Sequence, residues 1–139
     1  MRVLQDNLTV PTSGRGLHDI THAVAQFLSG QSVQTGLMTL FIRHTSASLL
    51  IQENADSDVL ADLERFMARL VQDGDPLFRH TAEGPDDMSA HVRTALTQTH
   101  LSIPVKNGRM TLGTWQALYV WEHRHRPHRR EVVLHYCGE

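Results

Sequence analysis

The hydrophobic positions of this 139-residue chain predict strands near both ends and helices between them. Residues 2–10 have the character of an edge strand. The continuous apolar run from Leu37 to Ile42 is typical of a strand buried on both faces. A second apolar piece, 49–51, follows a short polar segment. Further strands are expected at 101–105, 110–112, 114–122 and 130–136.

Three segments show the spacing of amphipathic helices. The first follows the Gly14-Arg15-Gly16 turn and ends at Ser29-Gly30. Its apolar side consists of Leu17, Ile20, Val24, Phe27 and Leu28. The second helix is predicted over 56–72 and the third over 85–98, where Gly84-Pro85 marks the start. Together with the strands, these helices predict a single α+β domain over residues 1–139.

Two features of the late strands add detail. Asn107-Gly108 is a strong signal for a tight hairpin between the strands at 101–105 and 110–112. In the strand at 114–122 both alternating sets of side chains are largely apolar, which predicts burial on both sides. One of these faces could be covered by another subunit, so a homo-oligomer is expected.

Composition narrows the class of protein. A formal net charge of −2 gives no field that would attract nucleic acid. Cys137 is the only cysteine, which excludes an internal disulfide and fits a reducing compartment. The first residues are too polar for a signal peptide, and no apolar run is long enough to span a membrane. We therefore expect a cytoplasmic protein with no nucleic-acid or membrane partner.

Histidine is unusually frequent, with ten residues against two Trp, two Tyr and four Phe. The densest group of candidate ligands lies between His80 and His91. On a helix, Asp87 and His91 share one face, and His80 on the incoming loop could fold back over it. These three residues are a candidate divalent metal site, for zinc, manganese, cobalt or magnesium, and Glu83 is a candidate catalytic carboxylate. Alternatively, the carboxylates only cap the helix and His91 is a structural histidine.

A second group of candidates follows the strand at 37–42. His44 is a candidate catalytic residue, and Thr45 and Ser46 are candidate substrate or anion ligands in the same turn. The alternative is that these hydroxyl groups only satisfy the turn. Near the end of the chain, Arg124 and Arg129 belong to a His/Arg-rich run that could clamp phosphate groups or be a solvated loop. Asp56 or Asn54 is expected to cap the second helix. Alternatively, a carboxylate there could complete a metal shell or orient a ligating histidine.

The order of several motifs resembles one known family. They are Gly14-Arg15-Gly16, Asp19-Ile20-Thr21, His44-Thr45-Ser46-Ala47-Ser48, Glu53-Asn54-Ala55-Asp56, the segment 80–91, Ile103-Pro104-Val105 and Leu112-Gly113-Thr114-Trp115-Gln116. On these residues the whole chain is identified as a member of the YjbQ family, also called the secondary thiamine-phosphate synthase family. One segment departs from the family pattern: many members have an Asp-Gly-Pro-Arg type loop where this chain has 123–128.

The resemblance implies an α+β domain with a mixed, bent sheet, assembled as a homotrimer, with metal or anion sites in clefts near the subunit boundaries. It also implies a metal-assisted reaction on a small phosphorylated molecule. Some members join a pyrimidine pyrophosphate to a thiazole phosphate and release pyrophosphate. Gln116 is a further candidate catalytic residue, because Gln116 and Glu122 on the strand at 114–122 could face the same cleft as the metal ligands. A metal-dependent hydrolase and a non-enzymatic trimeric metal- or ligand-binding protein are the alternatives.

Overall fold

The computed structural model describes all 139 residues and contains three helices and eight strands. The helices are α1 (Thr21–Ser29), α2 (Ser57–Leu70) and α3 (Asp87–Leu96). The strands are β1 (Arg2–Thr12), β2 (Gly16–Asp19), β3 (Gly36–Ile42), β4 (Ala47–Glu53), β5 (His100–Lys106), β6 (Arg109–Met110), β7 (Gln116–Glu122) and β8 (His128–Gly138). The predicted α+β class with three helices is confirmed.

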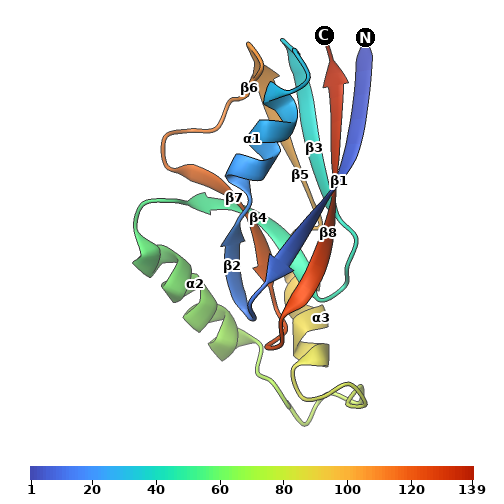
Figure 1. Cartoon of the computed structure of the whole chain (residues 1–139). Helices are drawn as coiled ribbons and strands as arrows, with labels where there is room; N and C mark the ends of the chain where they lie inside the picture. Colours follow the sequence, from blue (N-terminus) through green and yellow to red (C-terminus); the bar gives the residue numbers. More distant parts are fainter.

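The strands form two sheets. A five-stranded sheet has the order β1-β8-β3-β5-β6, and a three-stranded sheet has the order β2-β7-β4 (Figure 1). Every pairing is antiparallel, so the expected single mixed sheet is replaced by two antiparallel ones. β1 is an edge strand, as predicted, and the two chain termini lie side by side at one end of the molecule (Figure 1).

The main hydrophobic core lies between the two sheets. Side chains from the inner face of the five-stranded sheet, such as Leu40 and Leu134, pack with Val24 of α1 and with Leu118 and Val120 of β7. A second, smaller cluster forms on the other side of β7. There Trp121 packs against Met67 of α2 and Val71 just after it.

The two clusters explain why β7 is buried on both faces, as its sequence predicted. Residues Ala117 to Glu122 are all buried within the single chain. Helix α2 covers the face for which another subunit was expected. The burial of this strand therefore gives no support to an oligomer, and any subunit contact must lie elsewhere.

Two predictions about the elements are wrong. Leu17 lies on strand β2 instead of α1, because residues 16–19 pair with β7 and α1 begins only at Thr21. The strand at 37–42 is not buried on both faces: Leu37 and Phe41 are 43% and 48% exposed. They belong to the outer face of the five-stranded sheet, which no helix of this chain covers (Figure 1).

The remaining elements agree closely with the sequence. Both turn residues of the β5–β6 hairpin, Asn107 and Gly108, have the positive φ angles that a tight hairpin of this kind requires. The side chain of Asp56 accepts a hydrogen bond from the backbone of Asp58 and so caps α2, as expected. None of the three helices combines the length and apolar character needed to cross a membrane.

Candidate metal centre and adjoining cavity

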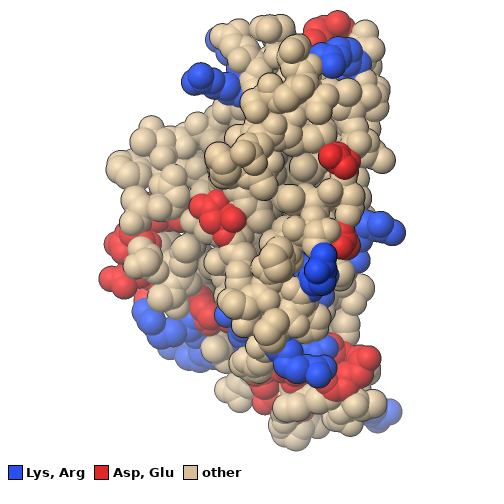
Figure 2. Space-filling model, in the orientation of Figure 1, with Lys and Arg blue, Asp and Glu red and all other residues tan.

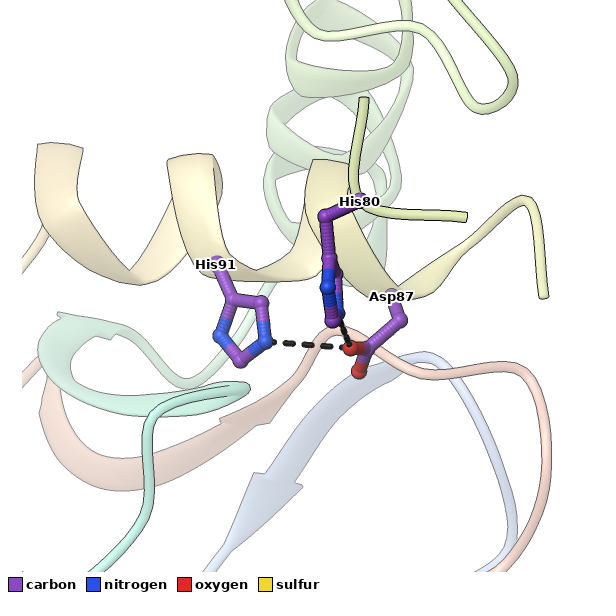
Figure 3. A group of neighbouring side chains, drawn as sticks. All are labelled: His80, Asp87 and His91. Carbon is purple, nitrogen blue, oxygen red and sulfur yellow. Dashed lines mark hydrogen bonds and ion pairs between the residues drawn. The ribbon is translucent and has the colours of Figure 1, made fainter. Parts of the chain in front are cut away.

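Helix α3 and the loop before it bring three candidate ligands together. Asp87 and His91 stand one helical turn apart, and His80 folds back from the loop onto the same carboxylate (Figure 3). His80 Nε2 lies 2.6 Å from Asp87 Oδ2, and His91 Nε2 lies 3.1 Å from the same oxygen. The expected cluster therefore exists as a geometric unit at the lower end of the molecule in Figure 1.

Hydrogen bonds fix the direction of the His91 ring. Its Nδ1 lies 2.8 Å from the backbone carbonyl oxygen of Thr45, so Nδ1 carries the proton and donates it. In the neutral ring, Nε2 then has a lone pair that faces the carboxylate of Asp87. This nitrogen and the carboxylate oxygen, 3.1 Å apart, are the two atoms that could bind one cation together.

The pKa shifts of Asp87 and His80 favour an ionised carboxylate beside positively charged groups. Burial alone would raise the pKa of Asp87, but hydrogen bonds from His80 and the charges of His91 and Arg124 lower it to about 2. The hydrogen bond to Asp87 raises the pKa of His80. The carboxylate is thus ionised at neutral pH and available as a ligand.

The donor set fits a divalent cation. Two imidazole nitrogens and one carboxylate oxygen lie within 4.8 Å of one another. His80, Asp87 and His91 would hold such an ion, which would supply a Lewis acid beside the cavity.

Arg124 has a different role from the anion ligand expected from the sequence. It is 9% exposed, and its Nη1 donates to Asp87 Oδ1 at 2.6 Å. Its other nitrogens donate to Asp86 Oδ2 at 3.2 Å and to the carbonyl oxygen of Glu83 at 3.0 Å. Because these contacts occupy the guanidinium, Arg124 orients the Asp87 carboxylate and ties it to the loop.

A cavity of about 410 Å³ adjoins the cluster. His91 forms one part of its wall and His44 another, so the structure brings together the two candidate groups that lie far apart in the sequence. The remaining lining residues are Thr45, Thr94, Ala95, Thr97 and Thr99. The lining is polar and contains no acidic side chain.

The other candidates from the sequence are placed less centrally. Glu83 is mostly exposed, with its carboxylate 3.5 Å from His80 Nε2. Arg129 is exposed at the start of β8. Gln116 lies at the opposite end of β7 from Glu122, where its side chain accepts a hydrogen bond from Gly113, so within one chain these two residues do not share a cleft.

A buried ion pair behind His44 was not predicted from the sequence. The carboxylate of Glu122, 0% exposed, accepts hydrogen bonds from Arg130 and from Thr12 Oγ1 at 2.7 Å. Arg130 also donates to Ser46 Oγ at 3.0 Å, so this hydroxyl, a candidate anion ligand from the sequence, has a structural hydrogen bond within the chain. The available signal was a glutamate that directly continues the apolar run of β7, a position where a charge needs a partner.

The start of the His/Arg-rich run is also buried, although a solvated loop was one interpretation of it. His123 is 0% exposed, and its Nε2 lies 2.9 Å from Ser48 Oγ. Burial lowers the pKa of His123 to about 3, so this ring is neutral. Figure 2 shows charged side chains of both signs gathered at the lower end of the molecule.

Comparisons with known proteins agree with this architecture. A family model described as UPF0047 protein YjbQ-like matches residues 6–139. A UPF0047 protein of Synechocystis sp. is 53% identical over 135 residues, which are 97% of this chain and 92% of the relative. The UPF0047 protein YjbQ of Salmonella typhimurium is 40% identical over 97% of this chain and 98% of its own length.

Solved structures give the same result. A conserved hypothetical protein from Thermus thermophilus has a TM-score of 0.83 and 39% identity, covering 92% of this chain and 97% of that one. A hypothetical protein from Aeropyrum pernix has a TM-score of 0.89 and 30% identity, with 98% and 99% covered. Sequence and structure agree over nearly the whole length, and this chain therefore belongs to the YjbQ (UPF0047) family.

Proposed function

We propose that this protein is a metal-assisted enzyme that acts on a small phosphorylated molecule. The observation that carries the proposal is the convergence of His80, Asp87 and His91 on one point beside a polar cavity. Arg124 orients the buried carboxylate of Asp87, and the backbone carbonyl of Thr45 orients His91. Metal ligands in proteins are commonly held by hydrogen bonds of this kind.

The cation in this proposal is zinc, manganese, cobalt or magnesium, held by His80, Asp87 and His91. Such an ion would neutralise the charge that develops on a phosphate or pyrophosphate leaving group. His44 lines the same cavity as His91, and burial and the charge of Arg130 lower its pKa. As a catalytic residue it would exchange a proton with the reacting group.

The specific reaction proposed, from the family resemblance, is thiamine-phosphate synthesis. A pyrimidine pyrophosphate and a thiazole phosphate would be joined with release of pyrophosphate. The His/Arg-rich segment 123–128 departs from the family pattern, but its buried end holds Asp86 and Asp87 in place through Arg124. The departure therefore affects support of the metal ligands more directly than substrate contact.

A homotrimer in the cytoplasm completes the proposal. The outer face of the five-stranded sheet offers apolar side chains for a subunit contact: Val3, Leu37 and Phe41 are 61%, 43% and 48% exposed. Cys137, the only cysteine, fits a reducing compartment.

The first test is metal content. Untagged protein purified without chelator is expected to hold about one divalent ion per chain, measured by elemental analysis. His91→Ala is expected to lose the ion, since a neighbouring ligand pair alone binds weakly. The exposed His22→Ala on α1 is the matched control and is expected to keep it. A folded wild-type protein without bound metal, even after incubation with each of the four ions, would contradict the metal site.

The second test is turnover with the metal so identified. Release of pyrophosphate that requires both the pyrimidine pyrophosphate and the thiazole phosphate is the expected result. Release from the pyrimidine compound alone would assign a hydrolase instead. Binding of either compound with no turnover under any of the four ions would assign a non-enzymatic binding protein.

A further inference from the structure

His44 is held between two hydrogen-bond donors. The backbone N–H of Glu131 donates to His44 Nε2 at 2.8 Å, and Nη1 of Arg130 lies 3.4 Å from His44 Nδ1. A neutral imidazole has only one nitrogen that can accept a hydrogen bond. Because the backbone N–H occupies Nε2, the ring proton must sit on Nδ1, where it faces the guanidinium of Arg130.

The guanidinium of Arg130 has donors to spare on that side. Its Nε and Nη2 donate to the carboxylate of Glu122, and Nη2 also donates to Ser46. Nη1 has no polar contact other than the Nδ1 of His44. Arg130 is 4% exposed, and its pairing with Glu122 prevents it from turning toward another partner. Nη1–H and Nδ1–H therefore converge with no acceptor between them.

Thr94, on α3, lines the same cavity of about 410 Å³ as His44 and His91. Its hydroxyl oxygen is itself buried and has no hydrogen-bond partner in the chain, so this group does not face the open space of the cavity. The unmatched donors at this place are therefore those of His44 and Arg130.

We propose that His44 Nδ1–H and Arg130 Nη1–H form an oxyanion subsite for a phosphate group of the substrate. The identity of the substrate rests on the proposed function, and the subsite itself rests on these two unmatched donors. A phosphate oxygen is the acceptor that donors of this number favour, because it can take several hydrogen bonds at once.

The placement of the subsite gives it a role in the reaction. One phosphate would lie against His44 and Arg130, in the same cavity that His91 lines. The metal ligands would then face the second phosphate of a pyrophosphate, or the leaving group. In this arrangement His44 is a phosphate-binding residue, and Glu122 and Ser46 are positioning residues that act through Arg130.

The tautomer of His44 gives a direct test. Nitrogen-15 spectra of the imidazole groups in metal-free protein are expected to show the proton on Nδ1, and titration with inorganic phosphate is expected to shift this signal. A proton on Nε2, or no change in the His44 signals on adding phosphate, would overturn the proposal.

Affinity for inorganic phosphate, measured by calorimetry on the metal-free protein, tests the His44 donor. Loss of a hydrogen bond to a charged group weakens binding about tenfold or more, which is the expected effect of His44→Ala. Thr94→Val leaves His44 and Arg130 in place and is expected to bind phosphate as tightly as wild type. Arg69→Gln, at an exposed arginine of α2 outside the cavity lining, is a second control and is also expected to bind phosphate unchanged.

The two proposals fail in different ways. Phosphate binding that is equally tight in His44→Ala and wild type would remove the subsite, even if the metal is bound and turnover occurs. Phosphate binding that depends on His44 in a protein without metal or turnover would keep the subsite and remove the proposed enzyme.

Discussion

At the scale of single residues, the site is built from charges that are buried only because they are paired. Glu122 is the clearest case, since its carboxylate ends a strand whose other members are mostly apolar. Burial alone would raise its pKa, but hydrogen bonds from Arg130 and Thr12 hold the pKa below its ordinary value of 4.5. The ionised carboxylate fixes Arg130, and through it the surroundings of His44.

We predict that Glu122→Gln destabilises the protein by about 3 kcal/mol at neutral pH, because it leaves the charge of Arg130 buried without a partner. Since the folded-state pKa is lowered, the contribution of Glu122 is present above pH 4.5 and is lost as the pH falls through that lowered value. Urea unfolding of wild type and variant should therefore give stabilities that converge in acid. Asp62→Asn, which removes an exposed ion pair, should change stability by less than about 1 kcal/mol, and an equally small effect of Glu122→Gln would refute the prediction.

At the scale of elements, the connection between α2 and α3 determines whether His80 reaches Asp87. Asp73 anchors the start of this connection through a paired ion contact with Arg15, at 2.9 and 3.0 Å. Its two ends are joined by a hydrogen bond from the backbone of Gly74 to the carbonyl oxygen of Pro85. The segment has no helix or strand of its own, and Ser89 and His125 also contact Asp73 while Arg124 holds the carbonyl of Glu83. These side-chain contacts hold the loop ligand of the site.

Arg15→Gln is expected to loosen this connection without unfolding the protein. Hydrogen exchange should become faster in residues 73–85, including the amide of Gly74, because Asp73 loses its paired contact with Arg15 and keeps only Ser89 and His125. Metal affinity should fall about tenfold as His80 becomes less ordered. Arg65→Gln, which removes an exposed contact within α2, serves as the comparison. Unchanged exchange in the connection of Arg15→Gln would show that other contacts hold it.

The sequence predicted α2, α3 and the hairpin well, because caps, periodicity and turn residues act locally. It could also place Asp87 and His91 on one face of α3, since that depends only on helical spacing. It could not show that the carbonyl of Thr45 contacts His91, that Arg124 pairs with Asp87, or that Arg130 contacts His44. Those contacts join segments that are distant in the chain, and they depend on how the two sheets pack.

At the scale of the whole molecule, the outer face of the five-stranded sheet is the part that a single chain does not complete. Leu37 pairs in register with Cys137, and Cys137 with Val3, so these side chains share one face across three strands. Phe41 extends the same face along β3. This uncovered apolar face is the surface on which the subunits of the proposed homotrimer would meet.

This leads to a prediction that separates assembly from folding. Phe41→Lys is expected to convert a trimer into monomers, because the side chain is 48% exposed in one chain but a charge there would be buried between subunits. Light scattering coupled to size exclusion measures the mass, and circular dichroism checks that the monomer keeps its fold. Phe66→Lys on α2 is the matched control, since Phe66 is 54% exposed and lies outside this sheet, so it should remain trimeric. A trimer that survives Phe41→Lys would show that the subunits meet elsewhere. A monomeric wild type would contradict the proposed homotrimer, and the metal site would then consist of residues from one chain.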